Sequence, residues 1–202
     1  MSSKLALTLS VALGIGIGLA APTLMEIAED TTGHGKPGHG TTAQVSTQTG
    51  EDRMQVTRIG TVETKYPPQL AIQLFTGEGE KYWLGDVGWN PAFPRGDGFN
   101  RGDIFTVGPN TFITIAYDAA AGIAQYARVE QGKSAGIIDV QVSATDGGSV
   151  ANVTYSMAGL SDEGDAAMDA LTDEAFAAQM ASWQVAIEAN DDAIHGWLAS
   201  RN

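Results

Sequence analysis

The amino-acid sequence predicts an α+β fold in which a curved antiparallel sheet wraps around a long C-terminal helix. Stretches with a hydrophobic period of two follow one another from residue 104 to residue 157, with turn residues between them. Two short apolar helical segments precede them, and hydrophobic residues at helical spacing run along the C-terminal part of the chain. A sheet and a helix that each have one apolar face bury those faces most economically against each other.

The first strand of this sheet begins at Arg53, where hydrophobic and polar residues roughly alternate as far as Val62. The sequence Tyr-Pro-Pro at residues 66–68 ends the strand, because proline has no backbone N–H for a ladder hydrogen bond. Pro68 suits the first turn of a helix, and the apolar residues up to Phe75 predict a short one. A second short helical segment is predicted at residues 81–84.

The remaining strands are predicted in the middle of the chain, at residues 104–107, 111–117, 123–129, 135–144 and 150–157. The segment 85–103 precedes them. It is rich in Gly, Asp, Pro and Asn and contains Trp89, Phe93 and Phe99. Loops of this length are often functional, and we expect this one to form the rim of a pocket.

The last part of the chain predicts a long amphipathic helix. Ser161 is a good N-cap, and the carboxylates of Asp162 and Glu163 favour the positive end of the helix dipole. One face carries the hydrophobic residues Met168, Phe176, Met180, Trp183 and Ile187 at helical spacing. After Asn190, the residues Ile194, Trp197 and Leu198 extend this helix or start another.

The N-terminal 25 residues predict an export device. Residues 5–21 carry no charge, Lys4 precedes them and acidic residues follow, which is the arrangement that sends the rest of a chain across a membrane. The segment is either a signal peptide cleaved near Ala20 or a transmembrane anchor extending to residue 25. In an anchor, Gly14 and Gly18 would let two membrane helices pack closely. Both alternatives place the protein on the extracytoplasmic, periplasmic side.

Residues 26–52 predict a flexible tether, because this Gly/Thr/His-containing segment has no hydrophobic period and too little apolar surface to fold alone. We expect the folded domain to occupy residues 53–202. The formal net charge of −13 disfavours nucleic acid as a partner. The chain has no cysteine and three histidines, none of them in the middle of the chain, so we expect no metal site and no cofactor.

Two sequence motifs resemble a bacterial branch of the START-like superfamily, also called SRPBCC or polyketide cyclase/dehydrase-like. The first is Phe-Thr-Gly-Glu-Gly-Glu at residues 75–80, followed by Trp83 and by Gly-Trp-Asn-Pro at residues 88–91. In it, Gly77 stands where that branch often has proline. The second combines residues 160–164 and 172–176 with Trp183, and the similarity covers roughly residues 53–189. The resemblance implies a helix-grip fold with a cavity between sheet and long helix for lipids, sterols, polyketides or other hydrophobic molecules.

The candidate ligand-binding residues follow from this cavity and from the predicted faces. We expect methionine and aromatic side chains of the helix to form an adaptable apolar wall opposite inward-facing strand residues. The wall candidates are Phe112, Tyr126, Arg128, Tyr155, Phe176, Met180 and Trp183. The rim candidates are Trp89, Phe93 and Phe99.

Three functions fit the sequence. The favoured one is binding of a hydrophobic small molecule or lipid by an exported or membrane-tethered domain. The second is an accessory subunit of a membrane protein complex, held by residues 5–25 if they are not cleaved. The third is a polyketide cyclase-like enzyme, in which tyrosines, carboxylates or arginine would do the acid–base work that histidine cannot. We assign no catalytic residue, and a binding role is favoured over an enzymatic one.

Overall fold

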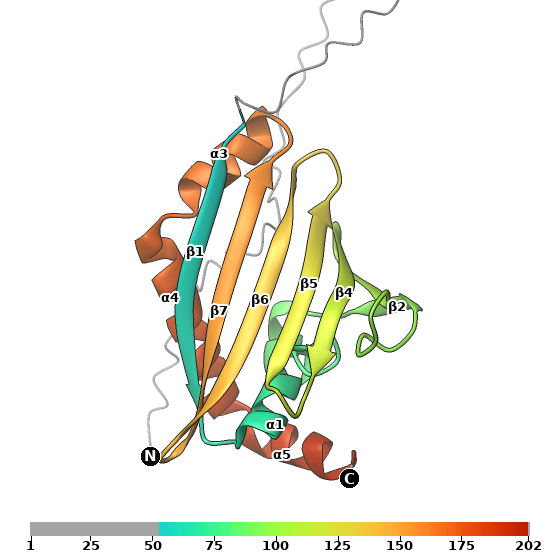
Figure 1. Ribbon diagram of the computed structural model, residues 1–202, viewed down its shortest axis with the longest axis vertical. Coiled ribbons are helices and arrows are strands. Elements are labelled where there is room, and N and C mark those ends of the chain that lie inside the picture. The colour runs from blue at the N-terminus through green and yellow to red at the C-terminus, as the bar shows by residue number, and fades with distance from the viewer. Residues whose placement is uncertain (1–52, 202) are drawn as a thin grey trace, which may run out of the picture.

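The computed structural model describes residues 53–201, which form a seven-stranded antiparallel sheet with helices packed on one of its faces (Figure 1). The strands are β1 (Gln55–Thr64), β2 (Ala92–Arg95), β3 (Ile104–Val107), β4 (Asn110–Asp118), β5 (Ile123–Glu130), β6 (Ser134–Thr145) and β7 (Gly148–Gly159). The helices are α1 (Pro68–Ala71), η1 (Ile72–Phe75), α2 (Lys81–Leu84), η2 (Gly85–Val87), α3 (Asp162–Ala170), α4 (Asp173–Ala189) and α5 (Asp191–Ala199). The predicted mixed fold with a sheet and C-terminal helices is confirmed.

The strand order in the sheet is β1-β7-β6-β5-β4-β3-β2. Every neighbouring pair except β1 and β7 is therefore joined by a direct connection along the chain. β1 pairs with β7 in one uninterrupted register, from Gln55 opposite Ala158 to Thr64 opposite Ser149. The first strand and the last strand thus form one side of the sheet together, in front of α4 in Figure 1.

The short helices after β1 form where proline and threonine direct the backbone. Pro67 is extended, and Pro68 begins α1 as predicted. At the end of η1, the Thr76 hydroxyl donates to the Gln73 carbonyl at 2.8 Å and accepts from the Gly79 N–H at 3.0 Å. This turn directs α2 back toward η1, where Trp83 Nε1 donates to the Leu74 carbonyl at 2.8 Å.

The predicted loop 85–103 contains regular structure that the sequence analysis did not predict. η2 continues directly from α2, and β2 pairs with β3 at the edge of the sheet. The following turn is organised by Asp103, whose carboxylate accepts hydrogen bonds from the backbone N–H groups of Asp97, Gly98 and Asn100. These hydrogen bonds, the one from Asn100 foremost, lower the pKa of Asp103.

The helix predicted from Ser161 onward is interrupted at Leu171, which the sequence did not predict, and the structure divides it there into α3 and α4. Leu171 leaves the helical region at φ −81° and ψ 65°, and Thr172 then caps α4 by accepting from the Ala175 N–H at 3.1 Å. The carbonyl that the break frees at Leu171 accepts a hydrogen bond of 2.6 Å from Arg58 Nε of β1. A cap and a side-chain donor thus compensate for the interruption. After Asn190, α5 starts anew, and its residues Ile194, Trp197 and Leu198 are buried.

α4 packs directly against β1 at Gly60. A Cβ atom at this position would lie 2.5 Å from Met180 Cγ and 3.2 Å from Phe176 Cε1. Only glycine therefore allows the helix to approach the strand this closely. Phe176 also contacts Tyr155 of β7, with ring centroids 5.1 Å apart.

The predicted N-terminal segments, residues 1–25 and 26–52 with Gly14 and Gly18, lie outside the described residues. Within residues 53–201, no helix has the length and apolar character needed to cross a membrane.

Candidate functional site

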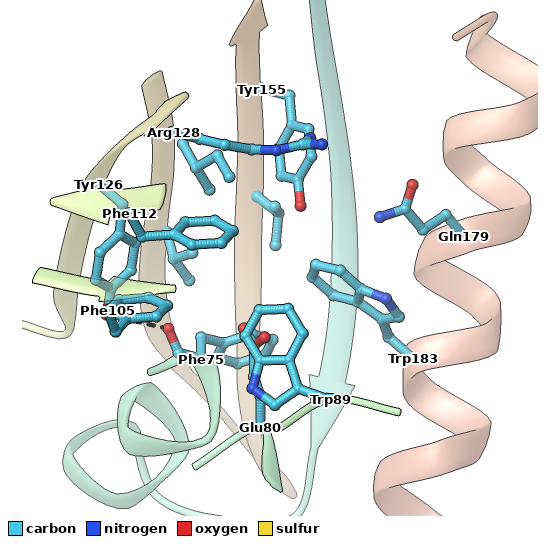
Figure 2. A pocket seen from close by; sticks show the side chains of 13 residues that line it. Phe75, Glu80, Trp89, Phe105, Phe112, Tyr126, Arg128, Tyr155, Gln179 and Trp183 are labelled. Carbon is cyan, nitrogen blue, oxygen red and sulfur yellow. Dashed lines mark hydrogen bonds between the residues drawn. The ribbon is translucent and has the colours of Figure 1, made fainter. Parts of the chain in front are cut away.

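A small, partly enclosed cavity lies between the sheet and α4 (Figure 2). Its volume is about 40 Å³. Its walls come from η1, the segment around α2 and η2, strands β3 to β7, and α4. The lining residues are Phe75, Glu80, Trp89, Phe105, Phe112, Tyr126, Arg128, Ile138, Val140, Val153, Tyr155, Gln179 and Trp183.

One part of the wall consists of aromatic rings that hold one another in place. Phe105 and Phe112 stack with centroids 4.7 Å apart and planes at 4°, and Tyr126 meets Phe105 edge to face at 5.7 Å. The Tyr126 hydroxyl donates to the Phe75 carbonyl at 3.2 Å. Trp89 covers Phe112 at 6.0 Å. Phe105, Phe112 and Tyr126 thus make this part of the wall apolar, and the Tyr126 hydroxyl donates to the backbone instead of to the cavity.

Arg128 brings a positive charge to the cavity from β5. Its Nε donates to Asn110 Oδ1 at 2.9 Å, which fixes the guanidinium at one end. Its Nη2 lies 3.9 Å from Glu130 Oε2, which is too far for a hydrogen bond. Glu130 is closer to Lys133 Nζ, at 3.3 Å. Part of the guanidinium therefore remains available to a group inside the cavity.

Tyr155 and Gln179 face each other across the gap between β7 and α4 (Figure 2). Burial raises the pKa of the Tyr155 hydroxyl to about 12, and the nearby positive charge of Arg128 and the amide of Gln179 act in the opposite direction. The hydroxyl is thus a neutral donor at physiological pH.

Trp183 contributes a second unused donor. Its Nε1 is buried and has no hydrogen-bond acceptor among residues 53–201. A buried polar group without a partner costs free energy, and such groups are uncommon in folded proteins. Gln179 precedes Trp183 by one helical turn and lies on the same face of α4.

Glu80 places a carboxyl group in the same cavity, at the start of α2. The residue as a whole keeps some solvent exposure, but Figure 2 shows the carboxyl directed into the cluster of aromatic rings. Burial raises the pKa of Glu80 well above its ordinary value, and no hydrogen bond or opposite charge from the described part of the chain counteracts this effect. The carboxyl group therefore favours its neutral form.

The structure brings together five of the seven predicted wall residues around the cavity: Phe112, Tyr126, Arg128, Tyr155 and Trp183. The other two, Phe176 and Met180, do not line it, because they pack against Gly60 of β1. Whether any of the seven binds a ligand stays a prediction.

Of the predicted rim residues, only Trp89 reaches the cavity. Phe93 packs on the outer side of Phe105, with centroids 5.9 Å apart. Phe99 lies against Tyr117 at 5.1 Å, and the Arg201 guanidinium covers its ring at 4.4 Å. These two aromatic residues stabilise the turn before β3 instead of forming a pocket rim.

Seven residues that line the cavity were not predicted from the sequence: Phe75, Glu80, Phe105, Ile138, Val140, Val153 and Gln179. Some had a signal in the sequence. Val153 lies two residues before Tyr155 on β7 and therefore on the same face of the strand. Gln179 lies at helical spacing between Phe176 and Trp183. Glu80 had none, because an acidic residue at the start of a short helix is ordinarily a solvated one.

Comparisons with known proteins give similarity in structure only. The sequence matches no known family model and no curated protein. The structure is similar to an uncharacterised protein from Rhizobium leguminosarum, with a TM-score of 0.51 and 14% identity over 67% of this chain and 96% of that one. It is also similar to the protein MLL2253 from Mesorhizobium loti, with a TM-score of 0.50 and 11% identity over 66% of this chain and 97% of that one.

A third similar structure is norcoclaurine synthase from Thalictrum flavum, with a TM-score of 0.49 and 13% identity over 79% of this chain and 98% of that one. The likeness to the Rhizobium and Mesorhizobium proteins shows a shared fold. Sharing this fold does not by itself assign an activity, since one fold hosts many functions.

Proposed function

We propose that this START-like domain binds a small, largely apolar molecule with a ring in the cavity between the sheet and α4. One observation carries the proposal: a partly enclosed apolar cavity contains several polar groups that lack a full set of partners among residues 53–201. Arg128, Tyr155 and Glu80 all reach it, and Trp183 Nε1 lies beside it without an acceptor. Ligand sites combine apolar walls with a few convergent polar groups in this way.

The size of the cavity limits the ligand. A volume of about 40 Å³ holds on the order of three water molecules. Ligand pockets usually have ~300–1,000 Å³, so the protein must open to bind. Trp89 is the side chain best placed to move, because it follows the left-handed residue Gly88 and its Nε1 makes one hydrogen bond, 3.0 Å long, to the Gly77 carbonyl. The ligand ring would take the place of the Trp89 indole against Phe112. A lipid would require a larger opening.

Comparing the wild type with a filled variant tests the proposal. Val140 lines the cavity, and Val140→Phe fills it, whereas Val185→Phe adds the same side chain at an exposed position of α4. Full-length wild type, V140F and V185F are purified from cells in parallel, extracted with organic solvent, and the extracts are compared by mass spectrometry. We expect a molecule that copurifies with wild type and V185F but not with folded V140F. Identical extracts from all three proteins would contradict ligand binding in this cavity.

We also propose that residues 1–25 carry the domain across a membrane. The support is the uncharged stretch 5–21 with Lys4 before it and acidic residues after it. A retained segment would make the protein membrane-tethered, and Gly14 and Gly18 could then dock it on a membrane complex as an accessory subunit. N-terminal sequencing of the protein from extracytoplasmic and membrane fractions tests this. A chain that starts at Met1 and stays in the cytoplasm would contradict export.

A second candidate function is polyketide cyclase-like catalysis, and Glu80 is the observation that favours it. A buried, neutral carboxyl group beside a cavity is a possible proton donor, and buried groups of shifted pKa cluster at active sites. Incubating the copurified molecule with wild type and Glu80→Gln distinguishes the two functions. Catalysis predicts a product that E80Q does not form although it still binds. An unchanged molecule with both proteins supports binding alone.

A further inference from the structure

We propose that the ligand of this cavity carries a carboxylate or an equivalent planar oxyanion, which binds between Arg128 of β5 and Tyr155 of β7. The ring of the ligand would lie against Phe112 on the other side. This inference rests on the proposed binding function and specifies the chemical class of the ligand. It follows from which polar groups meet in the cavity and which of their hydrogen bonds are already used.

The polar groups near Tyr155 are predominantly donors. Arg128 uses Nε for Asn110, and within residues 53–201 its Nη2 has Glu130 Oε2 at 3.9 Å but no acceptor at hydrogen-bond distance. The Tyr155 hydroxyl has the Gln179 amide as its polar neighbour from α4, and an amide that donates to the phenol oxygen leaves the phenol proton for another acceptor. Trp183 Nε1 can only donate. A ligand group that accepts several hydrogen bonds would satisfy this set.

Figure 2 shows the same arrangement in space. The Arg128 guanidinium, the Tyr155 hydroxyl and the Gln179 amide lie on one side of the cavity, and the rings of Phe105 and Phe112 lie on another. A ligand with an acceptor at one end and a ring at the other matches this division. Arginine binds carboxylates through two parallel hydrogen bonds, which adds orientation to charge.

The charge of the lining favours an anion. Among the thirteen lining residues, Arg128 is the only Lys or Arg and Glu80 is the only acidic residue. Burial favours the neutral form of Glu80, so the Arg128 guanidinium is the main charge in the lining. Glu130 lies outside the lining, 3.9 Å from Arg128 Nη2 and 3.3 Å from Lys133 Nζ, and therefore offsets that charge only in part. A cationic ligand would be repelled by Arg128, whereas a carboxylate pairs with it and accepts hydrogen bonds from the neighbouring donors.

Three probes of similar size test the proposal on the full-length chain. They are 4-fluorobenzoate, 4-fluorobenzamide and 4-fluorobenzylamine, titrated by ¹⁹F NMR. We expect wild type to bind the benzoate with a Kd about tenfold or more below that of the benzamide, because hydrogen bonds between ionised partners are stronger than those to a neutral amide. The benzylamine should bind most weakly. Trp89→Ala, which removes the indole over Phe112, should lower the Kd of the benzoate and of the benzamide.

Substitution of the arginine sharpens the test. Arg128→Met should raise the Kd of the benzoate about tenfold or more and that of the benzamide less than about threefold. Arg101→Met is the matched control, since Arg101 is exposed and does not line the cavity, and it should change neither. If R128M does not fold, the preference of wild type among the three probes decides.

The outcomes separate this inference from the function on which it rests. Equal binding of benzamide and benzoate, or tighter binding of benzylamine, would overturn the carboxylate preference while supporting a ligand site. If neither wild type nor W89A binds any of the probes, the proposal of a ring-binding cavity fails together with the inference.

Discussion

The two ends of the interior between sheet and helices differ in how completely their side chains are used. Where α4 crosses β1, Phe176 and Met180 pack onto Gly60 without room for a single extra carbon atom. Toward β4 to β6, the interior contains a cavity and polar groups such as Arg128 and Glu80. The first end holds the helix on the sheet, and the second contains polar side chains that can interact with a ligand. A fold of this kind can therefore keep a binding site without losing the packing that stabilises it.

Truncation at the packed end should have the largest effect. Phe176→Ala removes a fully buried ring that fills the contact between α4, β1 and Tyr155. We expect it to lower the free energy of unfolding by about 3–5 kcal/mol, measured by chemical denaturation. Val185→Ala on the exposed face of α4 should cost less than about 0.5 kcal/mol. A loss below about 1 kcal/mol for F176A would contradict the view that this contact holds the helix.

Removing the hydroxyl group of Tyr126 or of Tyr155 compares a hydroxyl that is hydrogen-bonded to the backbone with one that faces the cavity. Tyr126→Phe deprives the Phe75 carbonyl of its donor at 3.2 Å and should cost about 1 kcal/mol of stability. Tyr155→Phe removes a hydroxyl that faces the cavity and should cost less. In ¹⁹F titrations Y155F should instead weaken binding of 4-fluorobenzoate, and Y126F should not. The reverse ranking in denaturation and titration would contradict the assignment of the two hydroxyls.

The pH dependence of stability tests the burial of Glu80. The difference in stability between wild type and Glu80→Gln should be smallest at acid pH. Because burial raises its pKa above the ordinary 4.5, the folded state keeps this proton to a higher pH than the unfolded state. The contribution of the protonated Glu80 to stability is fully present below the pKa that Glu80 has in the unfolded chain. It is lost as the pH rises through the higher pKa that Glu80 has in the folded protein. Glutamine does not ionise, so the Tm of E80Q should exceed that of wild type increasingly above pH 4.5 and match it below.

Thermal denaturation from pH 4 to pH 9 measures this difference. Glu63→Gln serves as the control, since Glu63 is an exposed residue of β1. A constant difference in Tm between E80Q and wild type across this range would contradict burial of an ionisable carboxyl group in the cavity.

The sequence predicted the elements whose hydrophobic period is regular. The strands from Ile104 onward alternate clearly, and their predicted bounds differ from the observed ones by at most two residues at either end. β2 was missed because Ala92–Arg95 is short, contains Pro94 and has no alternation. The break at Leu171 was missed because hydrophobic spacing continues across it, although Thr172-Asp173-Glu174 is itself an N-cap sequence.

The candidate site was predictable only where a residue shares a face with the core. Tyr126 and Arg128 have the same strand parity, and both reach the cavity. Phe176 and Trp183 belong to one helical stripe, yet only Trp183 reaches it, because α4 lies across β1 and turns part of its stripe toward Gly60. Which residues of the stripe line the cavity depends on how α4 crosses β1. The hydrophobic period of the sequence does not determine this crossing. The inward direction of the Glu80 carboxyl depends on the turn at Thr76 in the same way.

The strand order also has a consequence for folding kinetics. Five of the six pairings join strands that are consecutive in the chain, so the meander from β2 to β7 can form through successive short loop closures. The pairing of β1 with β7 alone brings together residues far apart in the chain, Gln55 and Ala158, with all the other strands between them in sequence. Long-range pairing of this kind slows folding. We therefore expect docking of β1 to be the late step, and until then β7 presents a free edge at which a second chain could add.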